Sequence, residues 1–209
     1  MTVLVACEES QIVCKAFREL GHNAFSCDLQ SCSGGHPEWH ITGDALQLIN
    51  GYCDFVTDDG QYYSLDDTWD LLIAHPPCTY LTVAGASNLY RNGYLNTDRI
   101  KSGYEAAEFF MQFYNSNAKR ICIENPRPIS WFGLPPCNQV ISPHYYGSSY
   151  SKRTYLWLKH LPPLMSTMEV LNPIKCMDSK WFNTGSTNRQ KNRSKTFPEV
   201  AAAMAQQWG

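Results

Sequence analysis

Asp70-Leu71-Leu72-Ile73-Ala74-His75-Pro76-Pro77-Cys78 is the stretch that decides the fold of this 209-residue chain. Its apolar part, within residues 69–74, predicts a strand with both faces buried, which is typical of a parallel sheet covered by helices. The two prolines after it fix the backbone and lack amide donors. We therefore expect a rigid loop that holds the thiol of Cys78 in place at the end of a strand.

Outward from this stretch, short apolar runs alternate with amphipathic helical patterns. Alternation of this kind predicts an α/β fold of the Rossmann-like type, with a mostly parallel sheet and helices on both faces. The length favours a single domain over residues 1–209. The expected strands are residues 2–7, 23–28, 69–74, 120–124 and 155–158, and the expected helices are 11–20, 45–49, 99–114 and 200–208.

Two polar segments interrupt this pattern. The acidic insertion at about residues 54–68 predicts a solvated loop or hairpin, with a lid as the alternative. The segment at about 183–195 contains Arg189, Lys191 and Arg193 and predicts a basic loop or disordered arm.

The net charge of −2 gives no overall basic excess, so any contact with nucleic acid has to come from a local patch. The nine cysteines form no C-x-x-C pair, and Cys27, Cys32, His36 and His40 match no standard zinc spacing, so we expect no metal site. We find no signal peptide and no apolar run of membrane-spanning length. We therefore expect a cytoplasmic protein, in the host cytoplasm if a phage encodes it. The oligomeric state is left open.

Polar residues follow the ends of the expected strands, where open parallel sheets bind ligands. Asp28 is placed to accept hydrogen bonds from ribose hydroxyls, and Asp44 to accept from an adenine amino group; each could equally be a turn or helix-cap residue. The residues predicted to bind a cofactor are Ala6, Cys7, Glu8, Ser10, Asp28, Leu29, Asp44, Ala45, His75 and Pro76.

Cys78 and Glu124 are the predicted chemical groups. Cysteine is often a plain core residue, but the Pro-Pro context favours a functional thiol. Glu124 ends an apolar strand, and a dry environment there should raise its pKa. It could then donate a proton to a ring nitrogen, the alternative being a glutamate that faces water.

These segments resemble the carbon-5 cytosine DNA methyltransferases, most closely the short phage and prophage members. Pro76-Pro77-Cys78 matches the loop that carries the family's nucleophile, and Glu124-Asn125-Pro126 matches its Glu-Asn-Val segment. Ser151-Lys152-Arg153-Thr154-Tyr155 is similar to a reduced form of its Gln-x-Arg-x-Arg segment. Residues 194–201 are similar to the C-terminal segment that returns to the cofactor.

The resemblance implies S-adenosylmethionine as cofactor and covalent catalysis. Cys78 would add to carbon 6 of cytosine, and Glu124 would protonate or hydrogen-bond nitrogen 3. Carbon 5 would take the methyl group, and loss of its proton would expel Cys78. Arg153 would position the pyrimidine or orient Glu124, and a duplex substrate would need base flipping. The substrate contacts implied are Pro77, Thr79, Asn125, Pro126 and Lys152.

The sequence departs from the family in two places. Residues 6–10 contain no glycine where the family has Phe-x-Gly-x-Gly, and only 40 residues separate Arg153 from Ser194, too few for a usual target-recognition domain. Three hypotheses follow: DNA methylation, with a DNA-targeting protein as a possible partner; a Cys-dependent enzyme acting on free dCMP or dUMP; and an idle relative used as a binding or anti-defence protein.

Overall fold

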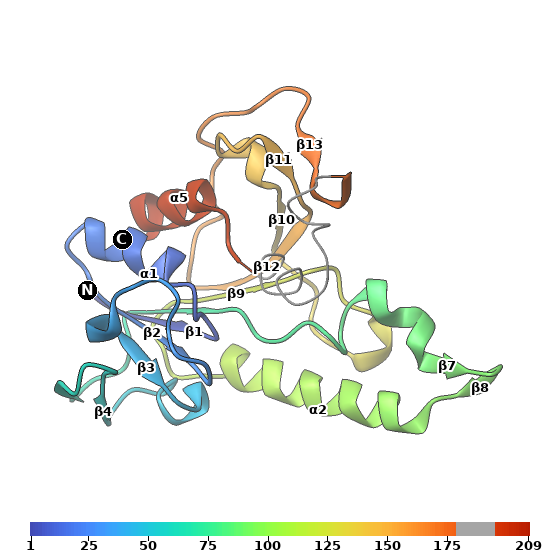
Figure 1. The fold of residues 1–209 in the computed structure, drawn as a ribbon, viewed down its shortest axis with the longest axis horizontal. Helices are drawn as coiled ribbons and strands as arrows, with labels where there is room; N and C mark the ends of the chain where they lie inside the picture. Colours follow the sequence, from blue (N-terminus) through green and yellow to red (C-terminus); the bar gives the residue numbers. More distant parts are fainter. Residues whose placement is uncertain (179–194) are drawn as a thin grey trace.

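A seven-stranded sheet forms the centre of the molecule (Figure 1), and the computed structural model describes residues 1–178 and 195–209. The sheet order is β10-β12-β9-β6-β1-β2-β3. The bounds are β1 Thr2–Ala6, β2 Asn23–Asp28, β3 His40–Thr42, β6 Leu71–Ala74, β9 Ile121–Asn125, β10 Gln139–Ile141 and β12 Thr154–Lys159.

The sheet is mostly parallel, as predicted. Each neighbouring pair in the run from β9 through β6, β1 and β2 to β3 is parallel, whereas β12 is antiparallel to both β9 and β10. The chain builds outward from β1 to β3 on one side and from β6 to β9 on the other. The strand order therefore reverses between β1 and β6, where ligands bind in open α/β sheets.

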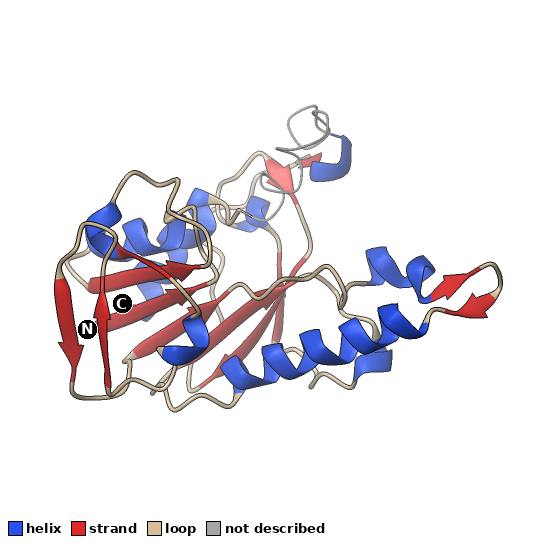
Figure 2. Cartoon of the chain, turned by 60° about the horizontal axis from the view of Figure 1, so that its bottom comes forward, coloured by secondary structure: helices blue, strands red, loops and turns tan. Residues whose placement is uncertain are grey.

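Helices cover both faces of the sheet (Figure 2) because the strand side chains alternate between them. Val3 and Val5 pack with α1 Ile12–Glu19 and α5 Pro198–Trp208 on one face. Leu4 and Ala6 pack with α2 Thr97–Tyr114 on the other. The expected fold class is thus confirmed at the level of a mixed α/β sheet compatible with a Rossmann-like fold.

Smaller elements surround this body. The acidic insertion is an antiparallel hairpin, and the helix expected at 45–49 is a single 3-10 turn. Of the basic loop expected at about 183–195, residues 183–194 lie outside the described part. The remaining bounds are β4 Cys53–Val56, β5 Tyr62–Leu65, β7 Tyr90–Arg91, β8 Tyr94–Leu95, β11 Tyr150–Ser151, β13 Ile174–Lys175, η1 Pro37–Trp39, η2 Ala45–Gln47, η3 Val83–Leu89, η4 Ser130–Phe132, η5 Pro143–Tyr145 and η6 Cys176–Asp178.

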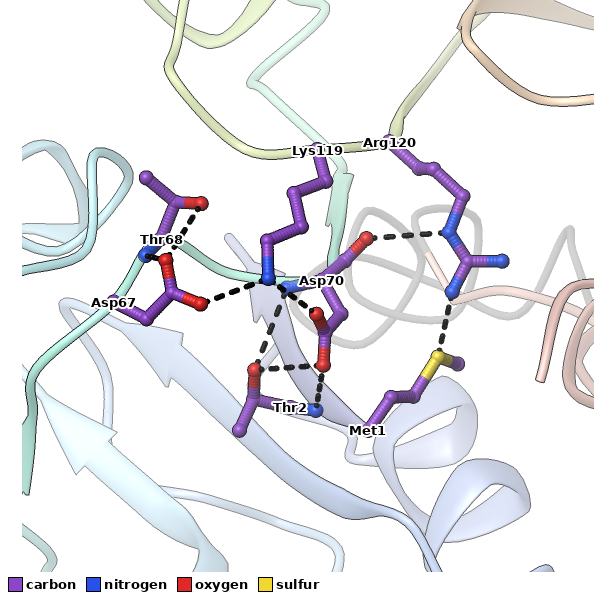
Figure 3. Close-up of polar contacts among 7 residues, drawn as sticks. All are labelled: Met1, Thr2, Asp67, Thr68, Asp70, Lys119 and Arg120. Atoms are coloured by element: carbon purple, nitrogen blue, oxygen red, sulfur yellow. Dashed lines mark hydrogen bonds and ion pairs between the residues drawn. The ribbon is translucent and has the colours of Figure 1, made fainter.

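A polar cluster fastens the amino ends of β1, β6 and β9 together (Figure 3). The Lys119 ammonium lies 2.8 Å from a carboxylate oxygen of Asp67 and 3.0 Å from one of Asp70. The backbone N–H of Thr2 donates to the second Asp70 oxygen. Within the described ranges, no helix is both long enough and apolar enough to cross a membrane.

Candidate active site at the carboxyl ends of the strands

The ends of β1, β2 and β3 bring Cys7, Asp28 and Asp44 together. Burial, and then the nearby charges of Asp28, Cys27 and Asp44, raise the pKa of the Cys7 thiol. One Asp28 oxygen accepts from the backbone N–H of Gln30 at 2.9 Å, and one Asp44 oxygen accepts from that of Leu46 at 3.0 Å. Both aspartates therefore brace turns, as the alternative interpretation predicts. Each keeps a second oxygen for which no hydrogen bond is seen among the described residues.

The loop after β1 adopts backbone conformations that usually favour glycine. Cys7 and Gln11 have φ angles of 59° and 58°, in the left-handed region that side chains other than glycine seldom adopt. Glu8 is buried, and its two oxygens accept from the backbone N–H groups of Val13 at 2.7 Å and Cys14 at 3.2 Å in α1. The carboxylate of Glu8 thus satisfies the helix N-terminus; its predicted cofactor contact stays a prediction.

A second segment, residues 29–36, packs over this loop. The backbone N–H of Ser33 donates to the carbonyl of Glu9 at 2.7 Å, and the Gln11 amide exchanges two hydrogen bonds with the backbone of His36. A Cβ on Gly34 would lie 2.5 Å from Gln11 Cβ and 2.7 Å from the carbonyl oxygen of Ser10. The absence of a side chain at Gly34 therefore lets residues 29–36 approach the loop after β1 closely. Sequence reasoning missed this, although the Gly34-Gly35 pair is its signal.

The loop after β6 is held by the segment that follows β9. The side-chain amide of Asn125 donates to the carbonyl of Pro76 at 2.9 Å, and the backbone N–H of Ile129 donates to the carbonyl of Leu81 at 2.7 Å. Asn125 is buried, so its first role is to clamp the Pro-Pro turn. Cys78 is half-buried at this turn. Pro77 and Thr79 are exposed beside it, and Pro126 is half-buried.

The carboxyl group of Glu124 and the ring of His75 are hydrogen-bonded to each other. Its Oε2 lies 3.1 Å from His75 Nδ1, and the two side chains are only 11% and 8% exposed. Burial alone would raise the pKa of Glu124, but the hydrogen bond from His75 and the positive charges of Lys152 and His75 outweigh it and lower the pKa. The expectation of a raised pKa is therefore wrong, because sequence gave no sign of the histidine.

Lys152, and not Arg153, is the cation that acts on Glu124. Antiparallel pairing of β12 with β9 sets Tyr155 opposite Asn125, so the residues before β12 reach the end of β9. Lys152 contributes to lowering the pKa of Glu124, whereas Arg153 does not and is exposed. Within the described part of the chain, the hydrogen bond to Glu124 comes from His75. The role expected of Arg153, to position the pyrimidine or orient Glu124, stays a prediction, and His75 is a further residue that is bonded to Glu124.

The donor pattern of S-adenosylmethionine fits the first half of the site. Its ribose hydroxyls and adenine amino group are donors, and Asp28 and Asp44 are acceptors. Both follow strands on the β1 side of the strand-order reversal, while Cys78 follows the strand on the other side. Ala45 is buried behind Asp44, Leu29 is exposed next to Asp28, and Ser10 is buried. In the segments that the structure describes, no group of three or more His, Cys, Asp or Glu side chains is placed to hold a metal ion.

Neither a protein-family model nor a curated protein matches this chain, so its function is argued from the site itself. The site combines a thiol on a rigid turn, an ionised carboxylate aimed by a histidine, and two further acceptors across the reversal of strand order. This combination suits nucleophilic attack on an electron-poor ring that the carboxylate holds by a polar edge.

Proposed function

We propose that the protein methylates carbon 5 of cytosine in DNA with S-adenosylmethionine, through a covalent adduct of Cys78. One observation carries this proposal: the Cys78 turn and the end of β9 are bonded directly to each other, by Asn125 to Pro76 and by His75 to Glu124. A nucleophile and the group that holds its ring target must keep a fixed separation. The match of Pro76-Pro77-Cys78 and Glu124-Asn125 to the family's motifs supports the same chemistry.

Each residue has a defined task in this proposal. His75 is hydrogen-bonded to Oε2 of Glu124. Oε1 would accept a hydrogen bond from the 4-amino group of cytosine. The Cys78 thiolate forms a bond from Sγ to carbon 6, and the electron pair moves toward nitrogen 3 and carbon 5. With His75 Nδ1 donating to Glu124, a proton would pass from His75 to the carboxyl group, and Glu124 would deliver a proton to nitrogen 3 as negative charge develops there.

The cofactor, when bound, supplies the methyl group that carbon 5 takes up. Asp28 and Asp44 would hold it through its sugar and base. Once a water molecule takes the proton from carbon 5, the electron pair of that C–H bond would re-form the ring double bond and the bond between Sγ and carbon 6 would break. Cys78 then leaves as a thiolate and the site is restored.

The test is transfer of label from methyl-labelled S-adenosylmethionine to four acceptors: duplex DNA, single-stranded DNA, dCMP and dUMP. We expect label on carbon 5 of cytosine in DNA, lost in Cys78→Ser and kept in Cys53→Ser, which changes a half-buried cysteine of the acidic hairpin. DNA with 5-fluorocytosine should trap the adduct, because fluorine cannot leave as a proton does.

The other outcomes decide between the alternatives. Label on dCMP or dUMP alone would identify an enzyme of free nucleotides. No transfer to any acceptor by a folded protein overturns catalysis. A biological effect that Cys78→Ser leaves intact would then indicate a binding or anti-defence protein.

A further inference from the structure

A projecting arm follows the Cys78 turn directly. We define the arm as residues 83–97, which comprise η3 and the β7–β8 hairpin. Figures 1 and 2 both show this hairpin extending beyond the body, past the start of α2 and on the side away from both termini. The turn at its tip is Asn92-Gly93, with φ angles of 53° and 81°. Two consecutive positive φ angles are the signature of a tight two-residue hairpin turn.

The base of the arm is fixed, so the hairpin is held out from a firm support. The Arg99 guanidinium donates to the carbonyl of Thr79 and lies over the Tyr80 ring, 4.3 Å from its centre. Asn96 accepts from the backbone N–H of Arg99 and caps α2, and Leu89 is buried in the core. These contacts join the arm to the turn that carries Cys78.

In the described part of the chain, large side chains at the tip are open to solvent. Tyr94 is 78% exposed and Tyr90 is 54% exposed, and Leu95 is exposed beside them. A hairpin with strands of two residues is marginal by itself and buries little. Tyr90 is paired with Leu95 and Arg91 with Tyr94, so the two tyrosines lie on opposite faces of the hairpin, and Arg91 shares the face of Tyr94. Exposed aromatic side chains on so short an element are typical of a contact surface.

The distribution of charged residues along the chain indicates which kind of partner would bind the arm. Residues 1–70 hold 12 of the 19 acidic residues and two of the 17 Lys and Arg residues, whereas residues 71–209 hold seven acidic and 15 basic residues. The formal charges are therefore −10 and +8. The first part forms β1, β2 and β3. The described residues of the second part, 71–178 and 195–209, form β6, β9, β12 and β10 and hold seven acidic and 11 basic residues, a formal charge of +4, so the division falls between β1 and β6.

The arm lies wholly on the basic side. No Asp or Glu occurs from residue 71 to residue 97, and the one charged residue of the hairpin is Arg91. At the base of the arm, the backbone N–H of Val83 donates to the carbonyl of Arg127, whose side chain is exposed. The arm thus presents tyrosine and arginine side chains and has no acidic residue of its own, the first one after it being Asp98 in the first turn of α2.

We infer that the arm is a nucleic-acid contact, in which Tyr90 and Tyr94 stack on or wedge between bases and Arg91 pairs with a phosphate. Aromatic side chains bind bases through their faces, and arginine binds phosphate by charge and paired hydrogen bonds. The inference deepens the proposed function, on which its place beside Cys78 rests. It names a polynucleotide as the partner and gives the arm the contact that a separate recognition domain would otherwise supply.

The experiment measures binding of the full chain to a fluorescent mixed-sequence duplex of about two helical turns, and to one of its strands, at low ionic strength. The double variant Tyr90→Ser/Tyr94→Ser should weaken affinity by about tenfold to a hundredfold. Tyr62→Ser is the matched control, since Tyr62 is 58% exposed on the acidic β4–β5 hairpin, and it should bind as the unaltered protein does. Arg91→Gln should lower the salt dependence of the affinity by about one phosphate contact.

Melting temperatures show whether the variants fold, and sedimentation shows whether they self-associate. The inference is overturned if the unaltered protein binds neither DNA, or if the double variant binds as tightly as Tyr62→Ser. A dimer that the double variant dissociates, with DNA affinity unchanged, would assign the arm to a second copy instead. Arm-dependent binding without methyl transfer would sink the proposed catalysis and leave the arm assignment standing.

Discussion

Glu8 and Glu124 are two buried glutamates on either side of His75, and their environments shift their pKa values in opposite directions. At Glu8, burial outweighs the charge of His75 and the amides of α1, and the pKa is raised. At Glu124, the hydrogen bond from His75 and the charge of Lys152 outweigh burial, and the pKa is lowered. Burial alone therefore does not decide the direction in which the pKa of a carboxyl group shifts, because a hydrogen bond and nearby positive charge can outweigh it.

Glu8 and Glu124 also differ in their hydrogen-bond partners. Both carboxyl oxygens of Glu8 accept hydrogen bonds from backbone N–H groups of α1, and these bonds stabilise the loop after β1. Among the described residues, Glu124 is hydrogen-bonded at Oε2 by the side chain of His75, and it lies at the end of β9 beside the Cys78 turn. Under the proposed function, Glu8 has a structural role and Glu124 a chemical one. Four measurements test this difference between the two glutamates.

We expect the largest effect in the methyl-transfer activity of variants at Glu124 and Glu8. Glu124→Gln should lower kcat/KM for DNA by about 10²- to 10⁴-fold, because an amide can neither take up nor pass on a proton. Glu8→Gln keeps an oxygen to accept from Val13 and should cost less than about tenfold. Steady-state methyl transfer by both folded variants measures this difference. Equal losses would show that the two glutamates are not divided in this way.

His75 should act through Glu124. His75→Leu removes the donor and the cation, so the pKa of Glu124 should rise and the acid limb of the rate profile should move to higher pH. The rate should fall by about tenfold to a hundredfold. His75→Asn places an amide donor near the position of Nδ1 and should recover part of the rate. An acid limb that stays in place in His75→Leu would contradict the positioning role.

The covering of the loop after β1 should depend on Gly34. Gly34→Ala forces a Cβ against Gln11 and the Ser10 carbonyl, and should lower the free energy of unfolding by about 1–3 kcal/mol. Gly43→Ala is the control, since a Cβ there meets nothing within 4 Å. Denaturant unfolding compares the two, and similar stabilities would mean that residues 29–36 do not brace the loop.

The smallest effect is the pH dependence of stability, about 1 kcal/mol for each residue. Glu124 has a lowered pKa, so its contribution is present above the ordinary value of 4.5 and is lost as pH falls through the folded value. Glu8 has a raised pKa, so its contribution is present below 4.5 and is lost as pH rises through the folded value.

Relative to the unaltered protein, Glu124→Gln should therefore lose stability as pH rises, and Glu8→Gln should gain it. Denaturant titrations from pH 3.5 to 7.5, or about that range, measure both slopes. If the stability of both variants, relative to the unaltered protein, changed with pH in the same direction, the pKa values of Glu8 and Glu124 would not be shifted in opposite directions.

Periodicity predicted most of the fold. The strand expected at 23–28 is β2 residue for residue, and the helix expected at 99–114 is α2 with two more residues at its start. Buried parallel strands are apolar throughout, so composition reveals them. The helix expected at 45–49 was too short for periodicity to distinguish it from one 3-10 turn.

Sequence predicted less about the site, because its decisive contacts join distant segments. His75 was expected to contact the cofactor, and its bond to Glu124 spans 49 residues. Arg153 was expected to position the pyrimidine or orient Glu124, which stays a prediction, and the effect of Lys152 on the pKa of Glu124 was not foreseen. The clamp of Asn125 on Pro76 does not follow from local pattern, and the Gly34-Gly35 pair indicates a tight approach without showing which residues it packs against.

The sequence by itself determined which runs of residues would be buried strands, and that Cys78 and Glu124 would each end one of them. Hydrophobic burial and the stiffness of proline are local properties, and they can be read from neighbours in the chain. Only the tertiary structure decided that β6 lies beside β9 and β12 beside β9, bringing His75 and Lys152 to Glu124. Charge interactions act over a few ångströms of space, whatever the separation in sequence, so the sign of the pKa shift of Glu124 had to come from the folded chain.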